Sequence, residues 1–325
     1  MPGPAKPLRV LYVIGTARSG STVLNTLLGS HPDIIGTGEL GYLSESEHAF
    51  QQICSCGYRA TECEFWSRVS REWLPTRAPE SMEEYAALQR RFEEGRFRPE
   101  ESVAPGHKQT TAYVRYSTLA AQLLSAIRRV SGKAIIVDST KTPWRADVLA
   151  SLPGVEVRVL HLVRHPAGVV WSMKKALSKE ARGGLTYPPP RHVVRSSIYW
   201  LIFNLQAASV RRRLPAGHSL RVRYEDLVRA PIETMCQIGS LLDCDLEDVG
   251  LRAASDESFS VEHTIAGNRL RMNGTMRLRM DTDWQNELSP LDRFICATLT
   301  GGLAKLYGYD NLFGLSRENP RALHS

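Results

Sequence analysis

Four short apolar segments, each followed by a turn and then a helical pattern, constrain the fold most. They are Arg9–Ile14, Ala134–Val137, Val157–Val163 and Leu220–Tyr224. Nearly continuous apolar strands that alternate with helices are typical of a parallel sheet covered on both faces. The sequence therefore predicts an α/β fold with a central parallel β-sheet, flanked by helices on both faces and joined by right-handed crossovers.

Helix signals follow these strands. Behind the first strand, apolar residues fall on one helical face and Gly29 predicts the stop. Pro143 and Pro166 stand where the first turn of a helix accepts a proline. The stretch 199–214, "YWLIFNLQAASVRRRL", predicts a long, largely buried helix whose cationic end suits its dipole.

The 325 residues are expected to form one domain, 1–325, because no linker or shift in composition marks a boundary. Insertions into this domain are expected at about 45–130 and 178–195. Within them, 45–106 is predicted to be partly helical and 178–191, "SKEARGGLTYPPPR", to be a mobile loop. No run of 18 apolar residues is present, so we expect a cytoplasmic protein without a membrane partner.

The net charge of +7 and pI near 9.2 suit an anionic small ligand, a nucleic acid or a membrane surface equally well. The basic residues are scattered, and no basic stripe interleaved with aromatics is visible. We therefore expect no nucleic-acid partner. The oligomeric state is left open.

Three of the six cysteines cluster in "CSCGYRATECEFW", as Cys54, Cys56 and Cys63. A metal site, a local disulfide and packed reduced thiols all fit such a cluster. Zinc would need a fourth ligand, and C-x-C departs from the usual C-x2-C pair, so the thiol and disulfide interpretations are preferred. We expect the cluster to lie outside the active site.

The segment Gly15–Thr22, "GTARSGST", has the spacing of a nucleotide phosphate loop, G-x-x-x-x-G-K-[ST], but Ser21 replaces its lysine. A glycine-rich turn that leads into a helix presents free N–H groups to an anion. The missing lysine argues against ATP hydrolysis, which needs it on the β- and γ-phosphates. Sulfuryl transfer is less demanding, since cationic side chains can replace the metal ion.

The stretch "GTARSGSTVLNTLLGSHPDIIGTGEL" resembles the 5′-phosphosulfate loop of sulfotransferases that use 3′-phosphoadenosine 5′-phosphosulfate (PAPS), of the bacterial and tyrosylprotein types. The positions that match are Arg18, Ser19, Gly20, Ser21 and Thr22. The resemblance implies a P-loop-like fold, PAPS as co-substrate without a metal, and transfer of a sulfonate group to an acceptor.

Further elements of the resemblance concern the donor. Arg164 ends the third strand and Ser172 follows on the next helix, similar to the family's 3′-phosphate element. Tyr224 matches a tyrosine that contacts the cofactor. The segment "EHTIAGNRLRMNG" resembles the part that folds over the nucleotide, with the expected contributors Gly267, Asn268, Arg269 and Arg271.

The resemblance also implies catalytic roles. Glu39 in "GTGEL" is the expected base, although one extra residue separates it from "HPD". Lys141 and Arg18 are expected to stabilise charge on the leaving phosphate, with Ser139 assisting. His263 is expected either near the transferred group or in a structural role.

Two alternatives are kept beside this interpretation: a P-loop kinase-like phosphotransferase with a displaced cation, and a basic nucleic-acid-binding protein. The insertions at about 45–130 and 178–195 are expected to lie on the acceptor side. The acceptor is left open among small molecules, sugars and peptides, with a hydroxyl or amine as the attacking group.

Overall fold

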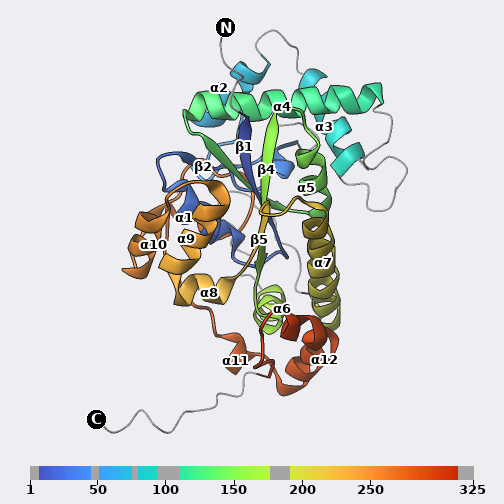
Figure 1. Cartoon of the computed structure of the whole chain (residues 1–325), viewed down its shortest axis with the longest axis vertical. Helices are drawn as coiled ribbons and strands as arrows, with labels where there is room; N and C mark the ends of the chain where they lie inside the picture. Colours follow the sequence, from blue (N-terminus) through green and yellow to red (C-terminus); the bar gives the residue numbers. More distant parts are fainter. Residues whose placement is uncertain (1–6, 45–50, 75–79, 94–109, 176–190, 314–325) are drawn as a thin grey trace.

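The computed structural model describes residues 7–44, 51–74, 80–93, 110–175 and 191–313, and a five-stranded parallel sheet lies at its centre (Figure 1). The strand order is β2-β3-β1-β4-β5. Their bounds are β1 Leu8–Ile14, β2 Ile34–Gly36, β3 Ile135–Lys141, β4 Val155–Val163 and β5 Ser219–Arg223. The four strands predicted from the sequence are confirmed. Strand β2 was not predicted, because three residues are too few to show a pattern.

Strand β1 occupies the middle of the sheet and decides where a ligand can bind. It pairs in parallel with β3 on one side and β4 on the other, with Ile14 aligned to Lys141 and to His161. The chain therefore turns first toward one edge of the sheet and later toward the other. Ligands of open α/β sheets bind at such a switch point, outside the carboxyl ends of the strands.

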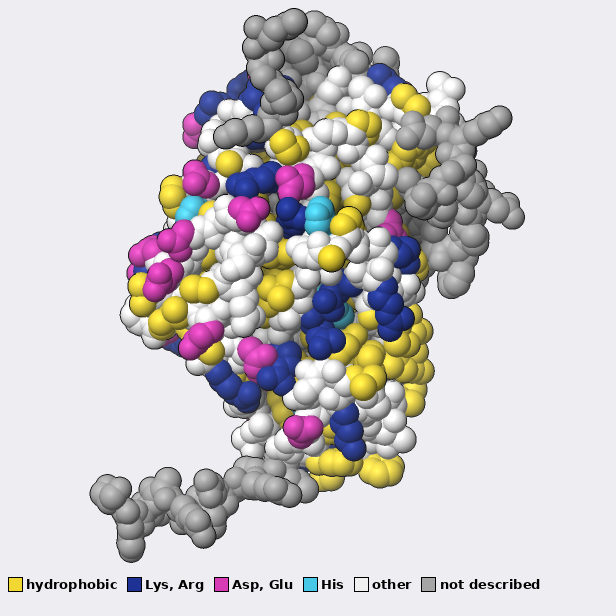
Figure 2. Space-filling model, viewed as in Figure 1, with side chains coloured by type: hydrophobic (Ala, Val, Ile, Leu, Met, Phe, Trp, Pro, Cys, Tyr) yellow, Lys and Arg dark blue, Asp and Glu magenta, His cyan; other side chains and the backbone are white. Residues whose placement is uncertain are grey.

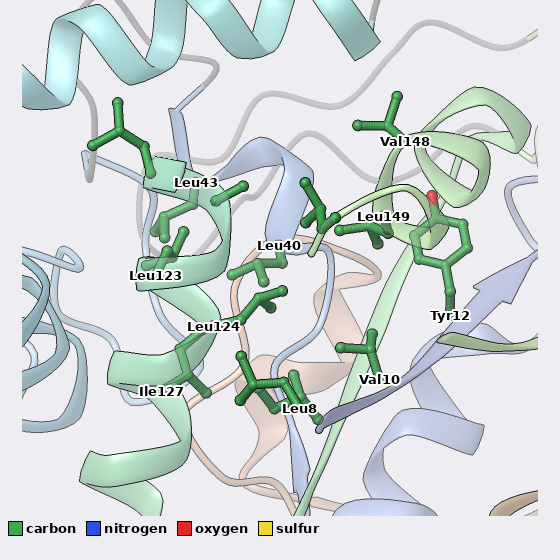
Figure 3. Packing of buried hydrophobic residues seen from close by; sticks show 14 of the residues in the cluster. Leu8, Val10, Tyr12, Leu40, Leu43, Leu123, Leu124, Ile127, Val148 and Leu149 are labelled. Atoms are coloured by element: carbon green, nitrogen blue, oxygen red, sulfur yellow. The ribbon is translucent and has the colours of Figure 1, made fainter. Parts of the chain in front are cut away.

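Helices cover both faces of the sheet, as predicted (Figure 1). Alternate side chains of β1 point to opposite faces: Val10 and Tyr12 pack with one core cluster, Leu11 and Val13 with the other. Figure 3 shows the first cluster, where β1 meets two of the helices that cover this face. Those helices include α4 Thr111–Ser131 and α5 Pro143–Ala150, and the opposite face carries α1 Ser21–Gly29, α9 Pro231–Leu242 and α10 Glu247–Ala254.

The remaining elements frame the carboxyl edge and the predicted insertions. They are η1 Leu40–Ser44, α2 Glu64–Trp73, α3 Glu80–Glu93, α6 Pro166–Lys174, α7 Val193–Arg213, α8 Tyr224–Arg229, β6 Phe259–Ser260, η2 Arg269–Asn273, β7 Thr275–Met276, α11 Trp284–Glu287 and α12 Pro290–Leu306. Helices α2 and α3 confirm that 45–106 is partly helical. The loop predicted at 178–191 lies, except for its last residue, outside the described residues.

Helix α7 forms where it was predicted but is not largely buried. It packs on α12, α6 and α5 along one side. Ile198, Ile202 and Leu205 on the other side are 41%, 46% and 51% exposed. Figure 2 shows hydrophobic side chains gathered on the part of the surface where α7 lies in Figure 1. Within the described part of the chain, no helix is both long and apolar enough to cross a membrane.

Candidate active site

A cavity of about 1030 Å³ opens at the carboxyl ends of the strands. Most residues predicted for the site line it; Ser19, Ser139 and His263 do not. The lining residues from that set are Arg18, Gly20, Ser21, Thr22, Glu39, Lys141, Arg164, Ser172, Tyr224, Gly267, Asn268, Arg269 and Arg271. Residues from 18 to 271 converge because β1, β3 and β4 are neighbours that end at the same edge.

The phosphate loop turns sharply from β1 into α1. Gly20 has φ of +98° and Arg18 has φ of +70°, both in the left-handed region. A β-carbon on Gly20 would lie 2.3 Å from the Tyr224 ring, so only glycine fits there. Helix α1 begins at Ser21, and the first N–H groups of a helix have no acceptor within it. The loop therefore presents an anion-binding helix terminus to the cavity.

Ser19 lies inside the loop rather than on the cavity wall. Its side chain is fully buried, and its N–H donates to the carbonyl of Thr16 at 3.2 Å. A β-carbon on Gly15 would come within 3.1 Å of Ser19 Oγ. Ser19 therefore packs inside the turn of the phosphate loop and does not face the cavity.

Arg164 links the tip of β4 to the phosphate loop. Its guanidinium donates to the carbonyl of Arg18 at 3.1 Å and to Asp281 Oδ2 at 2.8 Å, and lies 5.2 Å from the centre of the Tyr224 ring. Burial acts to raise the pKa of Asp281, but the ion pair with Arg164 lowers it below its ordinary value. Ser172, on α6, lines the same cavity. Arg164 and Ser172 therefore line the same cavity as the phosphate loop.

Glu39 and Lys141 form an ion pair at the tip of β3. Lys141 Nζ donates to Glu39 Oε1 and to the carbonyl of Ser139, the latter at 3.2 Å. Their side chains are 13% and 10% exposed. Lys141 has φ of +76°, a costly conformation for a residue with a β-carbon. Such strain clusters at functional sites, and here it lies next to the predicted base.

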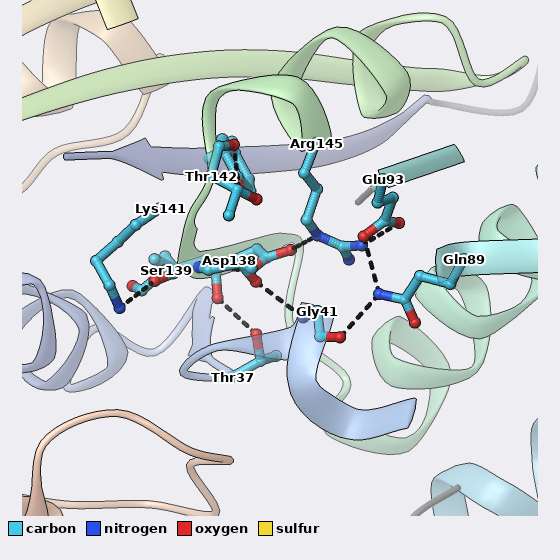
Figure 4. Close-up of polar contacts among 12 residues, drawn as sticks. Thr37, Gly41, Gln89, Glu93, Asp138, Ser139, Lys141, Thr142 and Arg145 are labelled. Atoms are coloured by element: carbon cyan, nitrogen blue, oxygen red, sulfur yellow. Dashed lines mark hydrogen bonds and ion pairs between the residues drawn. The ribbon is translucent and has the colours of Figure 1, made fainter. Parts of the chain in front are cut away.

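A buried network stands behind this pair (Figure 4). Arg145, only 2% exposed, donates to Asp138 Oδ2 at 2.8 Å and also pairs with Glu93. Asp138 accepts from the hydroxyl and N–H of Thr140, and that hydroxyl accepts from the N–H of Gly41 at 2.8 Å. The network therefore holds both Gly41, close after Glu39, and Thr140, next to Lys141.

The segment around Gly267, from the C-terminal part of the chain, forms one wall of the cavity. The N–H of Asn268 donates to Thr22 Oγ1 at 3.2 Å, and the N–H of Glu39 donates to the carbonyl of Ile265 at 2.8 Å. A β-carbon on Gly267 would touch both Glu39 and Thr22 at 3.3 Å. This segment therefore contacts both the base candidate and the phosphate loop.

Other predicted residues take different positions. Arg271 lines the cavity but is 1% exposed, and it donates to the carbonyl of Ile53 at 2.8 Å. Ser139 and His263 are not part of the lining. Ser139 Oγ reaches Asn25 Oδ1 at 3.5 Å, and His263 lies against the cysteine cluster.

Sequence reasoning missed several basic residues of the wall. Arg191, Arg277 and Arg279 also line the cavity, whose lining among the described residues includes eight Lys or Arg residues and two carboxylates, Glu39 and Asp281. The alternation of Arg277 and Arg279 in "MRLRMD" was a signal that they share one face. The excess of positive charge favours a ligand with more than one anionic group.

The solved structures that are similar to this chain include two sulfotransferase domains. The chain resembles the sulfotransferase domain of the Synechococcus PCC 7002 olefin synthase, with 19% identity over 95% of this chain and 98% of that one, at a TM-score of 0.51. It is also similar to the sulfotransferase domain from the curacin biosynthetic pathway, with 15% identity over 92% and 99% of the chains and a TM-score of 0.49. No curated protein matched.

The shared fold with the Synechococcus domain is the P-loop-like α/β sheet described above. A family model described as "Sulfotransferase family" matches residues 11–248, which include the phosphate loop, Glu39, Lys141, Arg164 and Tyr224. That match covers most of the chain, and the chain therefore belongs to the sulfotransferase family.

Proposed function

We propose that the chain transfers a sulfonate group from PAPS to an acceptor hydroxyl or amine, with Glu39 as the base. One observation carries the proposal: the N-terminus of α1, the Arg164–Ser172 pair and the Glu39–Lys141 pair line one cavity. A kinase-like function is not favoured, because the family match is to sulfotransferases and Ser21 stands where a kinase of this type holds its lysine.

The residues present fit a donor with two separate anionic groups. The first N–H groups of α1 would hold the 5′-phosphosulfate. Arg164 offers a planar fork of donors for the 3′-phosphate, and Ser172 adds a hydroxyl. The cavity of about 1030 Å³ lies at the upper end of small-molecule sites, roughly 300–1,000 Å³, so it leaves room for an acceptor beside the donor.

Glu39, Lys141 and Arg18 have different roles in the proposed reaction. Glu39 accepts the acceptor's proton as the acceptor oxygen or nitrogen bonds to sulfur, while the bond from sulfur to the bridging oxygen of the 5′-phosphate breaks. Lys141 and Arg18 stabilise the negative charge that this oxygen gains. The contact of Lys141 with Glu39 places the proposed base and the proposed cation next to each other.

The acceptor side of the proposed site includes two aromatic residues. Tyr199 and Phe203 of α7 line the cavity with their ring centres 4.4 Å apart. The hydroxyl of Tyr199 accepts from the N–H of Ala17, so its ring is fixed beside the phosphate loop. These rings would offer an apolar surface to a small-molecule, sugar or peptide acceptor.

Calorimetric titration tests the donor assignment. The product-like ligand 3′-phosphoadenosine 5′-phosphate should bind more tightly than ATP with Mg²⁺. Arg164→Ala should weaken it strongly, whereas Arg213→Ala, which removes a surface ion pair with Asp147, should not. Failure of the bisphosphate to bind, or unchanged binding in Arg164→Ala, would contradict the proposal.

A further inference from the structure

The cysteine cluster gains a fourth member in three dimensions. Ligand atoms of Cys54, Cys56, Cys63 and His263 all lie within 4.8 Å of one another. Nδ1 of His263 is 3.2 Å from the sulfur of Cys63 and 3.8 Å from that of Cys54. All six cysteines of the chain lie in the described part, and none forms a disulfide there. The sequence alone showed three sulfurs, and the fold adds an imidazole from 200 residues further along the chain.

These separations suit a tetrahedral metal ion. Zinc binds thiolate sulfur at about 2.3 Å and imidazole nitrogen at about 2.0–2.1 Å, and tetrahedral angles then place sulfur and nitrogen about 3.6 Å apart. The two observed sulfur–nitrogen distances, 3.2 and 3.8 Å, lie on either side of that value. Three thiolates with one imidazole are a donor set that selects zinc over the hard cations.

The local backbone positions the three cysteines. Cys54 and Cys56 lie on a tight turn, where the N–H of Gly57 donates to the carbonyl of Cys54 at 2.9 Å. Gly57 has φ of +90°, which glycine adopts without strain. Cys63 occupies the residue before α2, where the helix dipole stabilises a thiolate.

His263 is held from two sides. Its ring stacks on Phe65, with ring centres 5.6 Å apart and planes within 9° of parallel. Its carbonyl accepts from Nε1 of Trp66 at 2.9 Å. Both partners lie within three residues after Cys63, so the start of α2 holds a sulfur ligand and the imidazole together.

We propose that Cys54, Cys56, Cys63 and His263 hold one structural Zn²⁺ ion. The three thiols lose their protons on binding, and the four protein ligands fill the coordination sphere, which leaves no position for a substrate. A disulfide would use only two of the three sulfurs and would leave the imidazole without a role. The fourth ligand that was missing from the sequence pattern is His263.

The ion would fasten one wall of the cavity. Cys54 pairs with Ile265 in an antiparallel bridge, and the N–H of Ser55 donates to the carbonyl of Thr264 at 3.0 Å. Ile265 in turn accepts from the N–H of Glu39, and Asn268 contacts Thr22. The site therefore ties residues 54–63 to the segment that contacts the base candidate and the phosphate loop, without itself lining the cavity.

Metal analysis of the full-length protein tests this directly. Protein purified without chelators should contain about one zinc per chain by inductively coupled plasma mass spectrometry. Cobalt exchanged into the site should give the visible bands and thiolate charge-transfer absorption of a tetrahedral thiolate complex. A protein without zinc that also takes up no cobalt after full reduction, or an intact mass that shows a disulfide in the cluster, would overturn the proposal.

Variants locate the ion. Cys56 is exposed, so Cys56→Ser changes little in the core and should lower the zinc content strongly. Cys236→Ser, at an exposed cysteine outside the cluster, should keep one zinc. Full zinc content in both Cys56→Ser and His263→Ala would place the metal elsewhere and overturn the assignment. Zinc content is measured without donor or acceptor, so its outcome is independent of the proposed sulfuryl transfer.

Discussion

Glu39 and Lys141 form an ion pair although 102 positions separate them in the chain. The pair exists because β3 lies beside β2, so Lys141 at the tip of β3 reaches Glu39 in the loop that follows β2. The proposed base and the proposed cation thus come from different segments of the chain and meet only at the edge of the folded sheet.

Glu39→Gln should lower turnover about 10²- to 10⁴-fold, the usual contribution of a positioned base. The amide keeps the shape of the side chain and can still accept from Lys141, so the affinity for 3′-phosphoadenosine 5′-phosphate should stay within about two-fold. Steady-state rates and calorimetry measure the two effects. Glu84→Gln, which changes a surface pair with Arg115, is the control. Wild-type turnover in Glu39→Gln would remove Glu39 from the mechanism.

Ser172→Ala should weaken binding of 3′-phosphoadenosine 5′-phosphate about 10- to 150-fold, because a hydrogen bond to a charged group contributes roughly 1.5–3 kcal/mol. Adenosine 5′-phosphate lacks the 3′-phosphate, so its affinity should not change. Titration of both ligands into this variant and into Ser240→Ala, on the exposed side of α9, separates the effects. Equal loss for the two nucleotides would show that Ser172 does not contact the 3′-phosphate.

Gly20→Ala should destabilise the protein by about 1–3 kcal/mol, because the new β-carbon meets the Tyr224 ring at 2.3 Å in a left-handed conformation. It should also weaken donor binding, since the turn must shift. Gly302→Ala is the matched control: nothing lies near its β-carbon in α12, and alanine should stabilise that helix by about 0.5–1 kcal/mol. Urea unfolding of both variants measures the difference, and equal stabilities would contradict the expected clash.

Arg145→Met should cost about 3–5 kcal/mol of unfolding free energy, because it leaves Asp138 and Glu93 buried without their cation. Arg213→Met removes a pair with Asp147 whose arginine is 52% exposed, and should cost no more than about 1 kcal/mol. Chemical denaturation of the two variants provides the measurement. A similar small cost for both would show that the buried network adds little to stability.

Stability should fall as the pH drops below about 6.5. Burial lowers the pKa of His161 from 6.5 to about 3 and that of His165 to about 4. Below pH 6.5 the unfolded chain therefore binds protons that the native state does not. The contribution of these neutral histidines to the free energy of unfolding is fully present above about pH 6.5 and is lost as the pH falls toward their folded-state pKa values. Each histidine should cost about 2 kcal/mol between pH 6.5 and 5, since one pKa unit corresponds to about 1.4 kcal/mol.

His161→Gln tests the origin of this slope. Nε2 of His161 donates to Asn204 Oδ1 at 2.9 Å, a contact that the amide of glutamine can supply. The variant should show a shallower loss of stability between pH 7.5 and 5 in urea unfolding than the wild-type protein. Parallel curves for His161→Gln and wild type would assign the pH dependence to other groups.

The sequence by itself determined four of the five strands of the central sheet, the turn of the phosphate loop and the strand-tip residues that line the cavity. Continuous apolar runs, prolines at helix starts and the glycine spacing of the loop act within a few residues, so they are visible in one dimension. The exposure of one side of α7 could not be predicted from the sequence, because a helix with apolar residues on all sides has the same sequence pattern whether or not a neighbouring element covers it. The basic pair Arg277 and Arg279 was missed because a short alternating segment has no meaning until its cavity is known.

Tertiary structure alone decided which distant residues meet. The order β3-β1-β4 brings Lys141, the phosphate loop and Arg164 to one edge, and the return of residues 262–268 places His263 among three cysteines. A sequence pattern identifies candidate ligands and cations. Whether they form an ion pair or a coordination sphere depends on the distances between them, and for residues far apart in the chain these distances are set by how the sheet and its helices pack.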